Sequence, residues 1–315
     1  MNTMNQNSND ILNSAFSGLK LQDNANADRV ATLLDKFGLR WNVGKQPLYL
    51  GDGTATPFNA VVREDTGTSF TTVKSGYVPF QNSELAELLI RISDKAGYEI
   101  HSGGEFNGGG KVYLQLNSGN QITDLGKNRT TVNGFVTGLN SHDGTTSLKW
   151  GSVNFTVCCR NTFAMAQRTL ENSARHTASI HDRVDQALRQ IELVAAEEKS
   201  IFDTFIRLSN VPVTKANIAK IVKQATGVDI DKSKSDARTE VSTYAINRAG
   251  ELTNSIAREL DAKGDTLWGL FSGVTHYTSH VMSTPKRDNA RLESKYIGSG
   301  ATMDNEAYKT ILQMA

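Results

Sequence analysis

The spacing of apolar residues changes along the chain, and this change divides the protein into two halves. In the first half, short apolar runs alternate with polar positions and are separated by glycine-containing turns, a pattern typical of strands. In the second half, apolar residues recur every three or four positions, which is typical of amphipathic helices. The period changes near residues 160–166. Consecutive strands joined by tight turns favour antiparallel pairing, so the sequence predicts an α+β fold with an antiparallel strand-rich N-terminal half and a helix-rich C-terminal half.

The individual elements follow from the same patterns. Strands are expected at residues 48–50, 58–63, 70–74, 77–80, 98–101, 111–116, 130–139 and 146–160. A helix over residues 28–39 is expected to close at Gly38, and another is expected to begin at Asn82 or Ser83 as N-cap. Helices of the second half are expected at residues 180–208, 218–225, 237–260, 267–280 and 306–314. The chain is thus divided into a flexible tail (1–27), a strand-rich α+β core (28–175) and a helical region (176–315) that packs on the core.

Composition excludes some classes of function. The 38% hydrophobic and 21% charged content is that of a globular protein. Because 34 Lys and Arg residues face 33 Asp and Glu residues, the net charge of +1 gives no compositional argument for a polyanionic partner. A local basic face remains compatible with that balance. The first 22 residues lack the pattern of a signal peptide, and no apolar run approaches the ~20 residues of a spanning helix. We therefore expect no membrane association and a cytoplasmic location in a bacterial host cell.

Several motifs have a plain structural interpretation. Adjacent cysteines, Cys158 and Cys159, point to opposite faces of a strand, so they are expected to be reduced thiols. The glycine-rich segment 103–110 lacks the Gly-Lys-Ser/Thr ending and the following helix of a phosphate-binding loop, so it is interpreted as a hairpin tip. His276 and His280 have the i, i+4 spacing of a zinc edge but no third ligand. The sequence therefore indicates no metal and no cofactor.

The densest polar cluster contains His142 and Asp143, flanked by Asn140, Ser141 and Gly144. A histidine beside an aspartate can transfer protons or ligate a metal, which makes the pair a candidate catalytic centre, with Arg160 and Asn161 nearby in sequence. The same five residues also form a favourable tight turn, because Asn and Asp side chains bond their own backbone and glycine adopts positive φ. Both interpretations stay open at this point.

A basic segment spans the transition between the two halves. Between Lys149 and Arg189, basic residues outnumber acidic ones, which favours a phosphate-contacting surface. A solvated helix face with salt bridges is the alternative. The candidate nucleic-acid-binding residues are Lys149, Arg160, Asn161, Arg168, Arg175, His176 and Arg183. A second candidate surface, in which Trp268, Phe271, Tyr277 and Tyr296 stack bases beside nearby cations, competes with a buried apolar stripe.

Five segments carry a family resemblance when they are taken in order. They are Gly76-Tyr77-Val78-Pro79-Phe80-Gln81-Asn82, Asn140-Ser141-His142-Asp143-Gly144, Cys159-Arg160-Asn161-Thr162, Arg175-His176-Thr177, and Thr266-Leu267-Trp268-Gly269 with Thr275 and Tyr277. Together they resemble the phage/plasmid-like protein family catalogued as domain of unknown function 932, from about Trp41 to the final helix. The resemblance implies a phage or plasmid context and provides no catalytic residues.

That implied context favours handling of nucleic acid, in particular single-stranded DNA during recombination, annealing or replication, by a protein that could act as a homo-oligomer. A strand-strand-strand-helix core beside basic helices would also look like the architecture of single-strand annealing proteins, an analogy at the level of the fold. Two alternatives remain. One is a metal-dependent nucleic-acid enzyme centred on His142 and Asp143, and the other is a host-takeover factor that binds protein.

Overall fold

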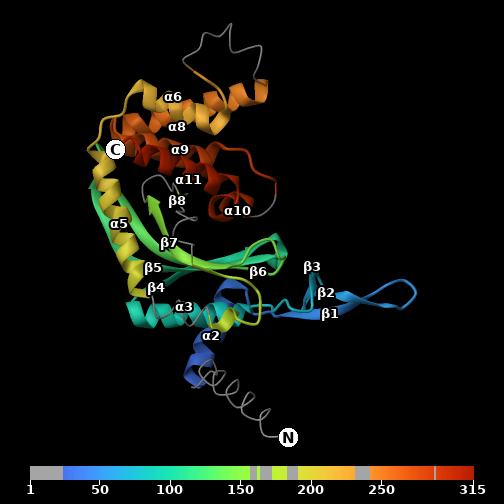
Figure 1. The fold of residues 1–315 in the computed structure, drawn as a ribbon. Coiled ribbons are helices and arrows are strands. Elements are labelled where there is room, and N and C mark those ends of the chain that lie inside the picture. Colours follow the sequence, from blue (N-terminus) through green and yellow to red (C-terminus); the bar gives the residue numbers. More distant parts are fainter. Residues whose placement is uncertain (1–23, 157–161, 164–171, 183–190, 231–241, 287–288) are drawn as a thin grey trace, which may run out of the picture.

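The computed structural model describes residues 24–156, 162–163, 172–182, 191–230, 242–286 and 289–315. It contains two antiparallel sheets in the N-terminal half and helices in the C-terminal half (Figure 1), which confirms the predicted α+β class. No described helix has the length and apolar character needed to cross a membrane.

The smaller sheet is a three-stranded arm that projects from the body of the protein (Figure 1). Its strands are β1 (Val43–Tyr49), β2 (Ala55–Arg63) and β3 (Ser69–Lys74), paired in chain order. The three predicted strands in this region overlap these elements. The strand predicted at residues 77–80 is wrong, because this segment has no strand partner. Pro79 has no N–H to donate, and the Val78 N–H instead donates to the His176 carbonyl.

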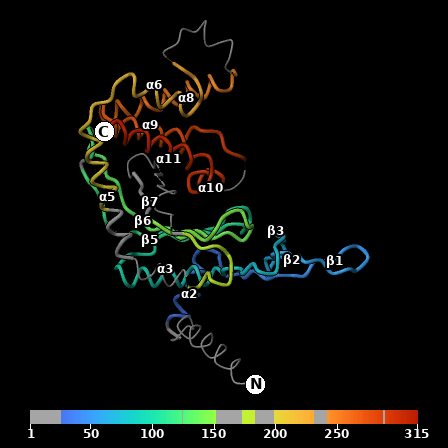
Figure 2. The backbone as a smooth tube through the Cα atoms, viewed as in Figure 1, coloured from blue at the N-terminus to red at the C-terminus, as the bar shows by residue number. Residues whose placement is uncertain are grey.

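The larger sheet is a meander in the order β4-β5-β6-β7-β8, and a short strand, β9, also pairs with β7. Figure 2 shows that the long strands β5 and β6 curve from the region of α3 towards the C-terminal helices. The bounds are β4 (Glu99–Phe106), β5 (Lys111–Leu125), β6 (Thr130–Ser141), β7 (Leu148–Thr156), β8 (Thr162–Phe163) and β9 (Asn172–Ala174).

Two helices pack beside this sheet, α2 (Asn24–Phe37) and α3 (Asn82–Ala96). Helix α2 ends as predicted before Gly38, which has a φ of 67°. Helix α3 lies so close to β6 that a Cβ on Gly138 would fall 2.7 Å from Leu89 Cδ2. The absence of a side chain at Gly138 therefore allows α3 to pack directly on the sheet.

The N-terminus of α3 differs from the prediction, because the N-cap is Gln81. The Gln81 N–H donates to the Glu84 carboxylate, while its side-chain amide pairs with both backbone groups of Val43. Asn82, the predicted N-cap, instead turns its amide inward and donates to the carbonyls of Leu39 and Trp41. Contacts some forty residues away in the sequence therefore set this helix start.

The glycine-rich segment is only partly a hairpin tip. As predicted, this segment contains the turn between β4 and β5, and the turn is a 3₁₀ element, η1 (Asn107–Gly109). However, Gly103 and Gly104 lie inside β4. A Cβ on Gly103 would lie 2.8 Å from the Phe37 ring of α2. This glycine therefore permits close packing between the helix and the sheet rather than a turn.

The C-terminal helices form a second core at the far end of the curved sheet. Phe205, Trp268, Phe271 and Tyr308 bring their rings together, with centroids 4.9–6.5 Å apart. These rings are buried, which confirms the interpretation of Trp268 and Phe271 as a core stripe and removes them as an exposed stacking surface. The helices are α5 (Ile191–Ser209), α6 (Lys215–Thr226), α8 (Thr243–Lys263), α9 (Leu267–His276), α10 (Ala290–Ile297) and α11 (Ser299–Leu312).

A buried ion pair joins the last three helical segments. Helix α9 continues into a π-helical turn, η3 (Tyr277–Val281). Within that turn, the Thr278 hydroxyl donates to Asp304 Oδ1 of α11 at 2.7 Å and accepts from Lys295 Nζ of α10 at 2.8 Å. Lys295 also forms an ion pair with Asp304, and both side chains are fully buried. Burial lowers the pKa of Lys295 and raises that of Asp304, while each charge stabilises the other.

Candidate functional site

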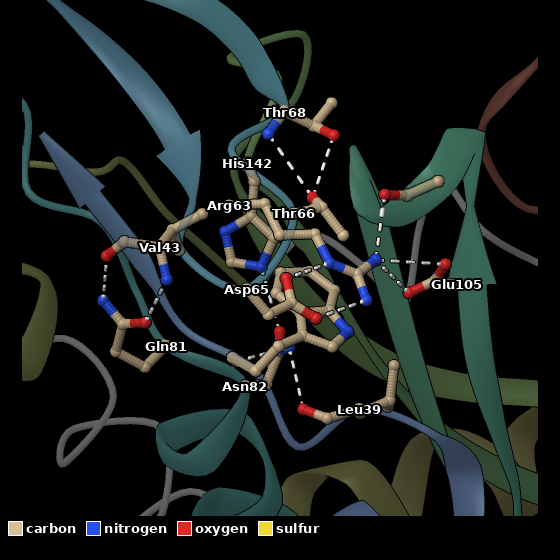
Figure 3. A network of polar contacts seen from close by, with 12 residues as sticks. Leu39, Val43, Arg63, Asp65, Thr66, Thr68, Gln81, Asn82, Glu105 and His142 are labelled. Carbon is tan, nitrogen blue, oxygen red and sulfur yellow. Dashed lines mark hydrogen bonds and ion pairs between the residues drawn. The ribbon is translucent and has the colours of Figure 1, made fainter. Parts of the chain in front are cut away.

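His142 lies at the end of β6 and is completely buried. Its ring packs edge-on to Trp41, with centroids 5.3 Å apart, and stacks on Phe70 at 6.1 Å. The ring atom Nε2 lies 2.9 Å from Asn82 Oδ1 (Figure 3). Since the Asn82 amide nitrogen already donates to two carbonyls, its oxygen must accept here. His142 therefore carries a proton on Nε2.

The electrostatic surroundings agree with a neutral ring. Burial is the largest effect and, together with the neighbouring His176 and Arg63, lowers the pKa of His142 to about 3; the nearby Asp143 only partly offsets this. A histidine that stays neutral and shielded from solvent is poorly suited to proton transfer with a substrate. The geometry favours a structural role, in which His142 ties the end of β6 to the start of α3.

This role predicts a pH dependence of stability. The unfolded ring binds a proton below pH ~6.5, whereas the folded ring does not until about pH 3. Stability is therefore fully present above pH 6.5 and decreases as the pH falls. Urea denaturation at pH 7.5 and 5.5 should show the wild type losing about 1.4 kcal/mol more than His142→Gln, which keeps a donor to Asn82. Equal losses in the two proteins would contradict a neutral buried ring.

Asp143 is engaged within its own turn. Its Oδ1 accepts from the hydroxyls of Ser141 and Thr145 and from the Thr145 N–H, at 2.6–3.0 Å. Its Oδ2 accepts from Lys111 Nζ at 2.7 Å. Burial by itself would raise the pKa of Asp143, but the bonds from Lys111, Thr145 and Ser141 outweigh it and leave the pKa lowered. Among the described contacts, no hydrogen bond joins Asp143 to His142. This favours the interpretation of the segment as a tight turn over that of a catalytic pair.

A cavity of about 480 Å³ lies beside the β6–β7 turn, and Thr145 and Thr146 of this turn line it. One wall is formed by β7 and the β6–β7 turn. The opposite wall is formed by the segment that contains α10 and the start of α11. Its volume is within the ~300–1,000 Å³ typical of ligand pockets. The wall is rich in hydroxyl groups and also carries two lysines and one glutamate. The lining residues are Lys111, Thr145, Thr146, Lys149, Ser283, Thr284, Pro285, Ala290, Glu293, Ser294, Ile297, Gly298 and Ser299.

The two lysines of the cavity differ in their partners. Lys111 is buried between two carboxylates, because its Nζ lies 2.7 Å from Asp143 Oδ2 and 3.1 Å from Glu293 Oε1. Its positive charge is therefore more than compensated by the two carboxylates. Lys149 on β7 is half-buried and has no ion pair or hydrogen bond with the residues that the structure describes. Lys149 thus supplies the positive charge that faces the cavity.

The other candidate nucleic-acid-binding residues are placed unevenly. Arg175 is exposed directly after β9, whose Ser173 pairs with Lys149 across the sheet. His176 is buried, its ring stacks on Tyr77 at 5.1 Å, and burial lowers its pKa, so its side chain does not face solvent. The remaining candidates lie outside the described residues. They are Arg160, Asn161, Arg168 and Arg183.

Sequence reasoning did not identify most of the cavity wall. Lys111 and Glu293 are separated by 182 positions, and no local pattern relates them. The serines and threonines of the wall carried no motif. The described residues contain no group of three or more His, Cys, Asp and Glu side chains able to hold a metal ion. The rings of His276 and His280 do lie near each other, with centroids 5.1 Å apart.

Comparison with known protein families shows the family to which the chain belongs. Residues 69–296 match the model of the family described as Domain of unknown function (DUF932), which confirms the predicted resemblance. The match covers more than half of the chain, and the protein belongs to this family. Searches of curated proteins and of solved structures gave no match. The matched region includes the His142 turn and most of the cavity wall, but not its last three residues, Ile297, Gly298 and Ser299.

Proposed function

We propose that this protein binds single-stranded nucleic acid, with DNA as the expected form, and that phosphate groups of the strand enter the cavity beside Lys149. The observation that carries the proposal is the position of Lys149, which has no ion pair with the described residues, in a cavity wall rich in hydroxyl groups. Phosphate oxygens are contacted in proteins mainly by lysine and arginine, by hydroxyl groups and by helix N-termini. The cavity offers each of these donor types except arginine.

Two features add to the electrostatic attraction. Helix α11 begins at Ser299 in the cavity wall, so the positive end of its dipole is directed there. Arg175 is exposed beside the strand that carries Lys149 and extends the positive surface away from the cavity. The carboxylate of Glu293 would repel a phosphate, but its Oε1 accepts hydrogen bonds from both Lys111 and Asn107, which lowers its effective charge. A phosphate beside Lys149 and the hydroxyl groups is the arrangement that this polarity favours.

The alternative of an enzyme centred on His142 and Asp143 receives no comparable support. His142 has no exposed surface and Asp143 is occupied by its own turn, so neither group is placed to act on a bound substrate. Binding, rather than turnover, is the function that this geometry supports best.

The proposal predicts a specific salt dependence. A labelled oligodeoxythymidine should bind the wild-type protein at low salt, and the logarithm of the binding constant should fall linearly with that of the salt concentration. Lys149→Gln removes one phosphate contact, so it should weaken binding and reduce the slope by about 0.7. Lys215→Gln, at an exposed site on α6, is the matched control and should bind as the wild type does. Folded wild-type protein that binds no oligonucleotide at low salt would overturn the proposal.

A further inference from the structure

The β1–β2 arm exposes large apolar side chains where solvent-facing strands usually carry polar ones. Tyr49 is 62% exposed, Leu50 58% and Phe58 40%. Tyr49 is the last residue of β1, Leu50 follows it, and Phe58 lies on β2. These two strands belong to the arm that projects from the body (Figure 1). Exposed groups of large apolar residues commonly mark binding surfaces. We therefore expect the arm to bind a partner, and the residues around it indicate the kind of partner.

Strand register places Tyr49 on the face of the arm that adjoins the cavity. Pro47 pairs with Asn59, Asn59 with Val73, and Val61 with Thr71, so these residues share one face. The register of β1 with β2 shifts after Pro47, and Tyr49 pairs with Ala55; both residues keep the alternation of their own strands and therefore stay on this face. On this face the Thr71 side chain meets the β6–β7 turn, because a Cβ on Gly144 would lie 3.5 Å from Thr71 Cγ2. The next residues of that turn, Thr145 and Thr146, line the cavity. The cavity, the turn and this face of the arm thus adjoin one another.

A cation accompanies the aromatic residue on this face. Lys45 precedes Tyr49 by four positions on β1, about 13 Å along the strand, and the alternation of β1 places both side chains on the same face. The Lys45 ammonium donates to the carbonyls of Ser75 and Tyr77, which hold it at the base of the arm without neutralising its charge. A cation at the base of the arm and an aromatic ring further along the same face suit single-stranded nucleic acid, because phosphates approach the cation and a neighbouring base stacks on the ring.

The tip of the arm has the opposite charge. Asp52 in the β1–β2 turn accepts a hydrogen bond from the Thr54 N–H at 2.8 Å and carries the negative charge of the turn. A phosphate backbone would be repelled at the tip itself. The favourable path for a strand therefore crosses the side of the arm at Lys45 and Tyr49 and does not extend around its end.

We propose that Tyr49 is a base-stacking residue for single-stranded nucleic acid, and that a strand whose phosphates lie in the cavity continues over the β6–β7 turn onto this face of the arm. The inference rests on the proposed function and extends it, because stacking requires unpaired bases. The arm then makes the protein prefer single strands to duplexes. Phe58 is paired with Lys74 and lies on the opposite face, so it has no part in this path.

The test compares three variants with the wild type in binding to a single-stranded oligonucleotide and to the corresponding duplex. Tyr49→Ala should weaken single-strand binding roughly 5- to 100-fold and leave both duplex binding and the salt slope unchanged. Tyr49→Phe, which keeps the ring, should retain wild-type affinity. Phe58→Ala is the matched control on the other face and should have no effect. Sedimentation of each variant monitors its oligomeric state.

Three results would overturn the inference. Tyr49→Ala could bind single strands as the wild type does, or Phe58→Ala could lose as much affinity as Tyr49→Ala. Tyr49→Ala could also change the oligomeric state without changing the preference for single strands, which would identify the arm as a contact between copies of this chain. Lack of any wild-type binding would overturn the proposed function itself, whereas the first three results leave it intact.

Discussion

Replacing Asp304 by alanine is expected to lower the free energy of unfolding by about 3–5 kcal/mol, since the change leaves the ammonium group of Lys295 buried without a counter-charge. The Thr278 hydroxyl alone cannot neutralise that charge. Because the pair joins η3, α10 and α11, the loss should affect the part of the helical region that forms the cavity wall.

Urea denaturation followed by circular dichroism measures this effect. Asp35→Ala is the matched control, because it breaks an exposed Asp–Arg pair and should cost less than about 1 kcal/mol. A double variant, Lys295→Met with Asp304→Leu, removes both charges and should recover most of the lost stability. A cost below about 1 kcal/mol for Asp304→Ala would show that the pair is not buried as described.

Replacing Lys111 by methionine is expected to cost about 3 kcal/mol, because the buried ammonium is shared by the carboxylates of Asp143 and Glu293. Without it, two like charges remain close together at the base of the cavity. Hydrogen bonding to Lys111 helps to lower the pKa of Asp143, so its removal lets burial raise that pKa. Protonation of Asp143 then stabilises the folded variant. The difference in the free energy of unfolding between the variant and the wild type should therefore narrow as the pH falls towards about 4.

Denaturation of Lys111→Met at pH 7 and at pH 4.5 tests this account. The double variant Lys111→Met with Glu293→Gln carries one carboxylate fewer and should be more stable than Lys111→Met at pH 7. A stability difference from the wild type that does not change with pH would contradict the proposed carboxylate repulsion.

Local patterns predicted the elements of this fold where local interactions set them. The Gly38 helix end and the strands around glycine turns depend on neighbours in the sequence, and the structure confirms them. The start of α3 was predicted one residue late, because Gln81 is held by the backbone of Val43 on β1. Gly103 was assigned to a turn, although it allows Phe37 to pack on β4. Contacts between distant segments decided these positions.

Only part of the candidate site could be predicted from the sequence. Lys149 was found because charge is visible in the sequence, and the structure places it at a cavity. The burial of His142 could not be predicted, because it depends on Trp41, Phe70 and Asn82, which lie sixty or more residues earlier in the chain. The role of Lys111 was also missed, since its two carboxylate partners come from different halves of the protein.

Chemical footprinting of lysines provides the most direct test of strand binding at the cavity. The protein is acetylated with and without a saturating oligodeoxythymidine, and modification of each lysine is measured by mass spectrometry. The oligonucleotide should protect Lys149, whereas Lys215 on α6 and Lys309 on α11, both exposed and outside the cavity, should react at unchanged rates. If the oligonucleotide binds and Lys149 reacts as fast as in the free protein, the strand does not enter this cavity and the account is wrong.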